Sequence, residues 1–231
     1  MRINLFCLPH AGGNGFSYQP LNKVTENSIN VKPLDYPGHG NRIREPLSKN
    51  ITEIADAVFE EIRNSLQTPY AILGHSMGTI TGYLLVRRIR EEKLPMPRHL
   101  FFTGRGAPFV PSSTPTKHSL SKEELLKVLD EMGGMSKEVL QSEDLWNWIE
   151  PILRSDLKAV ESYQHTTSDP FNIPVTIMLG SRDITKEADA DQWQKITTQE
   201  LELHTIEGGH FFIFESINEI GNIITAKLQS Q

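Results

Sequence analysis

The segment Tyr70–Gly78, with the sequence YAILGHSMG, decides the fold. An apolar run typical of a buried strand leads into GHSMG, and a helix-like run, Thr79–Glu92, follows. The pattern G-x-S-x-G between a strand and a helix predicts a nucleophile elbow, a sharp bend that holds Ser76 above the sheet. The bend also places the next backbone N–H at a helix N-terminus, where an oxyanion can bind. The alternative, a plain turn serine, needs neither flanking element.

Similar apolar, β-rich runs recur along the chain, and helix-like stretches alternate with them. The other expected strands are Ile3–Leu8, Ile29–Leu34, His99–Thr103, Val175–Leu179 and Leu201–Ile206. The other expected helices are Ile51–Leu66 and Ser216–Leu228. This alternation predicts an α/β fold with a mainly parallel sheet and helices on both faces. The length of 231 residues suits one domain over residues 1–231.

The alternation stops at about residues 108–168, where no convincing strand is present. After a linker with three prolines, APFVPSSTPTKHS, Ser121 and Glu124 form a capping-box pattern, and Gly133 marks the helix end. A second helical stretch, 143–163, is expected to break or restart at Pro151. We expect this helical insertion to form a lid, although a helical excursion with its own small core gives the same pattern.

A serine nucleophile needs a base, and in elbow-containing sheets the chain order is serine, acid, histidine. His210 follows the last expected strand, at the sheet edge where such folds place their sites, and is the expected base. A loop histidine that caps the following helix is the alternative. His165, at the end of the insertion, and His204, inside a strand, are less suitable.

The expected acid is Asp183, which ends the strand and turn VTIMLGSRD. Aspartate is also common in turns and at helix N-caps. Asp169 precedes this strand and so lies at the wrong end of the sheet, while Asp189 and Asp191 fall in a predicted helix. The loop CLPHAGGNG after the first strand is expected to supply a second oxyanion donor, because glycines let a backbone approach a substrate closely.

Composition excludes several other classes of function. The formal charge is −6 without a long basic block, which argues against nucleic-acid binding. No run reaches the ~18 apolar residues of a membrane span, and the first residues lack a signal-peptide pattern. The single cysteine, Cys7, indicates a reducing compartment, and we expect the cytoplasm. Together with His10, His39 and His75 it lacks zinc spacing, so no metal is expected.

The motifs along almost the whole chain, from Leu8 to about Ile213, together resemble those of type II thioesterases. These α/β-hydrolases accompany nonribosomal peptide synthetases and polyketide synthases. The matching motifs, in order, are LPHAGG, YPGHGNRIREP, GHSMG, FTGRGAP, LRSD, LGSRD and GGHFFI. The chain is also similar to animal medium-chain acyl thioesterases of fatty-acid synthesis.

The resemblance implies a role for each matching position. Ser76 would be the nucleophile, Asp183 the acid and His210 the base, with oxyanion donors at the backbone N–H groups of Ala11 and Met77. The implied substrate is an acyl group on the phosphopantetheine arm of an acyl or peptidyl carrier protein, with which a monomeric enzyme would associate transiently. No cofactor is implied beyond the arm that the substrate carries, and the insertion would be a mobile lid.

Some questions stay open at this point. Gly106 and Gly209 depart from the family, where a bulkier or charged residue and an aspartate, respectively, are expected. The triad serves oxyesters as well as thioesters, so a carboxylesterase or lipase remains an alternative, as does a medium-chain fatty acyl thioesterase. A non-catalytic binding protein on the same scaffold is a third alternative, against which the complete Ser/Asp/His set argues.

Two groups of side chains have both a functional and a structural interpretation. Apolar residues of the insertion would either line an acyl channel or pack the insertion against the body: Met132, Met135, Leu140, Trp146 and Trp148. A basic helix end would either attract an acidic carrier protein or form a solvated surface: Arg87, Arg88, Arg90 and Lys93.

Overall fold

The computed structural model describes residues 2–25, 29–111, 116–134 and 137–230. Its centre is a six-stranded sheet with the order β2-β1-β3-β4-β5-β6, in which every pairing is parallel. The strands are β1 Ile3–Leu8, β2 Ile29–Pro33, β3 Tyr70–His75, β4 Leu100–Thr103, β5 Val175–Gly180 and β6 Leu201–Ile206. The predicted strands and the parallel sheet are therefore confirmed.

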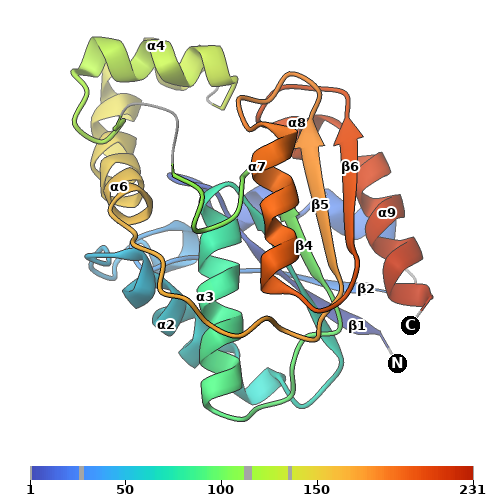
Figure 1. The fold of residues 1–231 in the computed structure, drawn as a ribbon. Helices are drawn as coiled ribbons and strands as arrows, with labels where there is room; N and C mark the ends of the chain where they lie inside the picture. The colour runs from blue at the N-terminus through green and yellow to red at the C-terminus, as the bar shows by residue number, and fades with distance from the viewer. Residues whose placement is uncertain (1, 26–28, 112–115, 135–136, 231) are drawn as a thin grey trace.

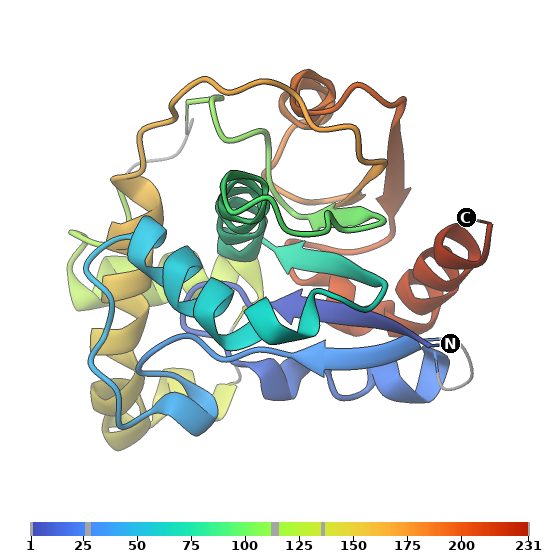
Figure 2. The same cartoon turned by 90° about the horizontal axis from the view of Figure 1, so that it is seen from below.

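Helices cover both faces of this sheet (Figures 1 and 2). On one face α2, Ile51–Ile62, and α3, Met77–Glu91, pack over alternate strand residues such as Ile72. On the other face α9, Ile217–Gln229, packs over the strand residues in between, such as Leu73. Two buried faces explain why the strands read as continuous apolar runs. The short helices are α1 Leu21–Thr25, α7 Glu187–Asp191 and α8 Phe212–Glu215.

The insertion between β4 and β5 contains α4 Lys122–Met132, α5 Lys137–Gln141 and α6 Glu143–Glu161. The predicted capping box is present, because Ser121 and Glu124 each accept a hydrogen bond from the other's backbone N–H. Gly133 ends α4 in the left-handed region, with φ 72°. The expected break at Pro151 is wrong, since α6 continues through it. Proline removes one helical hydrogen bond, and buried residues on both sides of it keep the helix together: Trp146, Ile152, Leu153 and Leu157.

The insertion lies on the side of the sheet where the strands have their carboxyl ends, to which β5 and β6 point (Figure 1). It has a small core of its own, formed by Leu125, Leu129, Trp146, Leu153 and Leu157. The Arg154 guanidinium of α6 donates to the carbonyls of His118 and Leu120, at 2.9 Å and 2.8 Å, and so fixes the segment before α4. No helix within the described ranges is long and apolar enough to cross a membrane.

Candidate active site

The bend between β3 and α3 has the geometry of a nucleophile elbow. Ser76 adopts φ 53° and ψ −112°, a region that a residue with a Cβ rarely occupies. A Cβ on Gly74 would collide with the carbonyl oxygen of Gly78, and a Cβ on Gly78 with that of Leu8. Glycine is therefore required on both sides of the serine, which explains the G-x-S-x-G spacing.

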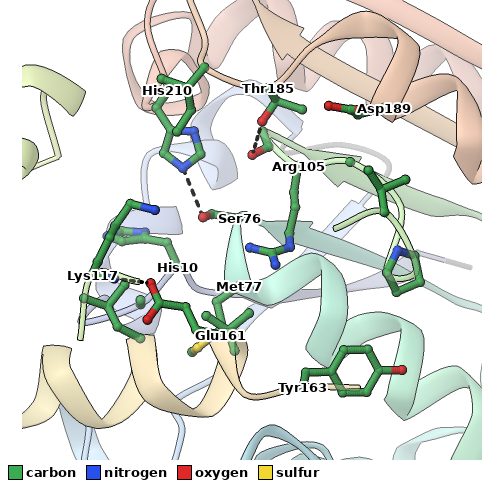
Figure 3. Close-up of a pocket in the computed structure, with 18 of the residues that line it drawn as sticks. His10, Ser76, Met77, Arg105, Lys117, Glu161, Tyr163, Thr185, Asp189 and His210 are labelled. Carbon is green, nitrogen blue, oxygen red and sulfur yellow. Dashed lines mark hydrogen bonds between the residues drawn. The ribbon is translucent and has the colours of Figure 1, made fainter. Parts of the chain in front are cut away.

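Three side chains that are far apart in the sequence meet at this bend. His210 Nε2 lies 3.0 Å from Ser76 Oγ, as drawn in Figure 3. His210 Nδ1 lies 3.0 Å and 3.1 Å from the two carboxylate oxygens of Asp183. A carboxylate only accepts, so Nδ1 carries the proton and Nε2 is free to accept from the serine hydroxyl. The side chains of His210 and Asp183 are 5% and 0% exposed, so water does not compete for these contacts.

The loops after β5 and β6 hold the acid and the base next to each other. Asp183 lies in a turn closed by its own N–H, which donates to the carbonyl of Gly180 at 3.0 Å. The N–H of Arg182 donates to the carbonyl of Gly208 at 2.9 Å, which joins this turn to the loop that carries His210. Neighbouring parallel strands end at the same edge, so their loops are in register for this contact.

The other downstream histidines have different partners. His165 lines the same cavity as Ser76, but its ring packs against Tyr83 and Phe109. His204 lies on β6, with Nε2 at 3.0 Å from a carboxylate oxygen of Glu202. Among these histidines, the structure brings His210 to the serine.

The rival aspartates also lie elsewhere. Asp169 precedes β5, and its carbonyl accepts from Arg90 at 2.7 Å. Asp189 and Asp191 belong to α7, as predicted. Asp189 reaches the cavity wall but makes no contact with His210 among the hydrogen bonds of the described residues. The structure therefore pairs His210 with Asp183.

The two departures from the family fit their surroundings. A Cβ on Gly106 would lie 2.9 Å from Asp189 Cβ, so glycine lets the loop after β4 approach α7. The N–H of Ala107 donates to the Asp189 carbonyl at 3.1 Å across this close approach. A Cβ on Gly209 would meet nothing within 4 Å, so this departure leaves the geometry of His210 unaffected.

Two further histidines, His75 and His10, lie close to His210. The His75 ring centroid is 5.2 Å from that of His210, and His10 is 5.8 Å from His75. Burial, with a smaller contribution from the charge of His210, lowers the pKa of His10 to about 3. The same two causes lower the pKa of His75 well below its ordinary value. Both rings therefore stay neutral around pH 7.

The loop that carries Ala11 lies beside the serine. Ala11, Ser76 and Met77 line one cavity. Gly12 takes the left-handed conformation, with φ 72°, and its N–H donates to Asp156 Oδ2 at 2.8 Å. The loop is thus held against α6 of the insertion by Asp156, the last residue of the LRSD motif, to which the sequence analysis gave no individual role.

His39 makes a second contact with Asp156, and its ring is charged. His39 Nε2 lies 2.8 Å from the same oxygen of Asp156, and His39 Nδ1 lies 3.0 Å from the carbonyl of Pro37. Both partners only accept, so both ring nitrogens donate and the ring is positive. Burial alone would lower the pKa of His39, but the hydrogen bond and charge of Asp156 outweigh it and raise the pKa. The ion pair is buried, with both side chains 3% exposed.

The cavity next to Ser76 has a volume of about 610 Å³. Its walls come from the loops after β1 and β4, from α4 and α6, and from the loop that carries His210. Apolar residues of the insertion form one side: Leu129, Met132, Leu153, Leu157 and Val160. Polar and charged side chains also reach it, as Figure 3 shows for Arg105, Lys117 and Glu161.

The structure separates the apolar residues of the insertion for which two interpretations were open. Met132 does line the cavity. Trp146 is instead buried in the core of the insertion, and Trp148 is 60% exposed on its surface. Met135 and the side chain of Leu140 lie outside the described residues. Trp146 shares a face of α6 with Leu153 but lies two turns earlier, where it packs into the core of the insertion, and Trp148 is on the exposed side of the helix.

The arginines at the end of α3 are engaged within the chain. Arg87 donates to the carbonyl of Thr166 at 3.1 Å, and Arg90 stacks on Phe171 at 4.5 Å. Arg88 pairs with Glu92 at 2.9 Å. Because α3 begins at Ser76 and runs away from it, these groups lie at the end of α3 remote from the serine. Their contacts favour the structural interpretation over a docking role.

No group of three or more His, Cys, Asp or Glu side chains suited to a metal ion occurs in the described part of the chain.

Comparison with known proteins places this site in a family. The family described as "Thioesterase domain" matches residues 3–228. The gramicidin S biosynthesis protein GrsT of Aneurinibacillus migulanus is 32% identical over 99% of this chain and 90% of its own length. The medium-chain S-acyl fatty acid synthase thioesterase of Homo sapiens is 29% identical over 94% of this chain and 83% of its own.

A solved structure agrees with these relatives. The type II thioesterase BorB from the borrelidin biosynthetic cluster superposes with a TM-score of 0.89 and 30% identity, covering 99% of this chain and 93% of BorB. The expected α/β-hydrolase fold is thereby confirmed. The parallel sheet, the elbow and the matched length agree with one conclusion: this chain belongs to the thioesterase family.

Proposed function

We propose that this chain is a type II thioesterase that removes acyl groups from the phosphopantetheine arms of carrier proteins in nonribosomal peptide or polyketide assembly. The likeness to GrsT and BorB supports the pathway class. The observation that carries the proposal is the contact of Ser76 Oγ with His210 Nε2 at 3.0 Å, beside a cavity of about 610 Å³.

In the first half-reaction Ser76 is the nucleophile. Its oxygen bonds to the thioester carbonyl carbon while its proton moves to His210 Nε2. Asp183 holds the ring in the required tautomer and stabilises the imidazolium. The N–H groups of Ala11 and Met77 stabilise the oxyanion, a contribution that typically amounts to about 10²–10³ in rate for each donor. The carbon–sulfur bond then breaks, and the leaving sulfur takes the proton from His210.

The second half-reaction repeats these roles with water. Water attacks the acyl-serine carbonyl carbon and gives a proton to His210 Nε2. The ester bond to Ser76 breaks, and His210 returns the proton to the serine oxygen. A free carboxylic acid leaves the cavity, and the triad is restored.

The helical insertion is proposed to act as a lid. It supplies Leu129, Met132 and Leu153 to the cavity wall, and α6 also contacts the loop of Ala11 through Asp156. A carrier protein would approach the open side, and its arm would bring the thioester to Ser76. Closing such a cavity excludes water, which strengthens every electrostatic contact with the reacting group.

A medium-chain fatty acyl thioesterase is the second candidate. The human relative supports it, as does the apolar side of the cavity. Hydrolysis rates measured from acetyl to dodecanoyl on one carrier protein separate the two. Assembly-line editing predicts no rise in kcat/KM beyond short chains, whereas a fatty acyl enzyme shows a maximum at medium length.

The test of the proposed activity uses an acyl carrier protein loaded with a short acyl group. Ser76→Ala is expected to lower kcat by about 10³ or more, because it removes the nucleophile. Ser65→Ala, at an exposed serine that does not line the cavity, is the control. An oxyester of the same acyl group measures the preference for thioesters. Undiminished hydrolysis by Ser76→Ala would contradict the proposed triad, and faster cleavage of the oxyester would favour a carboxylesterase.

A further inference from the structure

Arg105 presents a charged group to the cavity, and none of the described residues pairs with it. It follows β4, and its backbone is fixed because the Trp193 indole donates to its carbonyl at 2.9 Å. The half-buried side chain points into the cavity that also contains the Ser76 hydroxyl (Figure 3). Its guanidinium forms no hydrogen bond or ion pair with any residue that the structure describes. Burial lowers the pKa of Arg105, and the charge of Glu161 only partly opposes this effect.

Glu161 is the carboxylate whose charge acts on Arg105, but its oxygens already have other hydrogen-bond partners. It accepts from the backbone N–H groups of Lys117 and His118, at 2.8 Å and 3.2 Å. It also lies 2.7 Å from His118 Nδ1. These contacts place the carboxylate on the segment before α4 and leave Arg105 unsatisfied.

The remaining charges do not neutralise Arg105 either. Lys117 lines the same cavity; burial lowers its pKa, the charge of Glu161 opposes this effect, and the charge of Arg105 adds to it, so Lys117 cannot act as the acceptor. Asp189 reaches the cavity as well but forms no ion pair with Arg105 among the described residues. The guanidinium of Arg105 therefore has no hydrogen-bond acceptor among the described residues.

A partly desolvated guanidinium without an acceptor is costly unless a ligand supplies one. Its planar donors match a carboxylate with two parallel hydrogen bonds. We propose that Arg105 binds a carboxylate carried by the acyl group, so that the enzyme favours ω-carboxyacyl thioesters over alkanoyl thioesters of equal length. This proposal rests on the proposed thioesterase function and names the class of acyl group that the site takes.

The phosphate of the phosphopantetheine arm is the other anion of the substrate. It lies at the carrier end of the arm, a whole pantetheine chain away from the sulfur. When the thioester is at Ser76, the acyl group and the pantetheine chain extend from opposite sides of the thioester, and the phosphate remains near the carrier protein. Arg105 shares a cavity with Ser76, which favours the acyl carboxylate.

The experiment measures kcat/KM for malonyl, succinyl, glutaryl and adipoyl thioesters, each against the alkanoyl thioester of the same length. Both series are made on N-acetylcysteamine, which has no phosphate, and on phosphopantetheine. The enzymes are the wild type, Arg105→Gln, Arg105→Lys and the control Arg98→Gln, which changes an exposed arginine before β4. Enzyme-free rates are subtracted.

We expect at least one carboxyacyl member to exceed its alkanoyl partner with the wild type. In Arg105→Gln this ratio should fall about tenfold to a hundredfold on both carriers, the usual effect of losing a hydrogen-bonded ion pair. Arg105→Lys should retain part of the ratio, and Arg98→Gln all of it. Thermal unfolding of Arg105→Gln should show no loss of stability, because an unpaired buried charge is removed.

Two results would overturn the proposal. One is a ratio that stays the same in the wild type and Arg105→Gln for every chain length. The other is a loss confined to phosphopantetheine thioesters, whatever the acyl group, which would assign Arg105 to the phosphate. Absence of all thioester hydrolysis by the wild type would instead refute the proposed function itself, so the two failures are distinguishable.

Discussion

Ser76 is the proposed nucleophile, and it also has a strained backbone conformation. Its positive φ of 53° lifts the hydroxyl towards His210 but places a Cβ where sterics disfavour it. Such a conformation typically costs about 1–3 kcal/mol and persists because the surrounding structure enforces it. Here the glycines at 74 and 78 and the hydrogen bond from the Ser76 N–H to the Thr103 carbonyl, at 2.9 Å, enforce it.

Replacing Ser76 by glycine should therefore separate stability from activity. Ser76→Gly removes the strained Cβ, and we expect its free energy of unfolding to exceed that of Ser76→Ala by about 1 kcal/mol, after the entropic cost of glycine. Both variants lose the nucleophile. Urea unfolding of the two proteins measures the difference, and a glycine variant that is clearly less stable than the alanine variant would argue against strain at the elbow.

At the scale of elements, α6 holds the loop after β1. Leu153 of α6 contacts Gly12, where an added Cβ would lie 3.1 Å from Leu153 Cδ1, and Asp156 accepts from the Gly12 N–H at 2.8 Å. The adjacent N–H, that of Ala11, is a proposed oxyanion donor. The insertion thus acts on the reaction through the position of this loop, and Asp156 is a positioning residue.

Asp156→Ala should lower kcat more than it raises KM. Losing the geometry of one oxyanion donor typically costs about 10²–10³ in rate. Asp156→Asn keeps an acceptor for the Gly12 N–H and should recover part of kcat. Steady-state kinetics, with exposed Asp144→Ala on the same helix as control, test this effect. If Asp156→Ala unfolds at a lower temperature but keeps its kcat, the contact is only structural.

The sequence predicted regular elements better than it predicted contacts between them. All residues of β3 are buried, so its apolar run is unambiguous, and the capping box of α4 is a local signal. The continuity of α6 through Pro151 depends on tertiary packing, which the local pattern does not contain. Asp156 and Gly12 are 144 positions apart, and no periodicity links them. Arg105 lies in a recognised motif, but only the cavity shows that its charge is unpaired.

At the scale of the whole molecule, buried neutral histidines make the fold sensitive to acid. Burial lowers the pKa of His10 to about 3 and that of His99 to about 4, and it also lowers the pKa of His75 well below its ordinary value. Their ordinary value is 6.5, so the unfolded chain binds more protons than the folded one as pH falls below it. His39 acts in the opposite sense, because its raised pKa gives stability that is lost as pH rises through the folded value.

We expect the free energy of unfolding to fall between pH 6.5 and about 4, by up to roughly 4 kcal/mol per pH unit if three protons are involved. Urea unfolding across this range measures the slope. His99→Gln, which removes a histidine held by the Thr176 hydroxyl at 2.8 Å, should reduce the slope by about one proton. Stability that stays constant from pH 7 to pH 5 would contradict the burial of these rings.

The most direct test of the central claim is the intact mass of the protein during turnover of a short-chain acyl thioester, quenched in acid within the first catalytic cycles. We expect a mass increase of one acyl group, located on the peptide that contains Ser76. In His210→Ala the same adduct should form at a greatly reduced rate. An acyl adduct on another residue, or full turnover by Ser76→Ala, would contradict this claim.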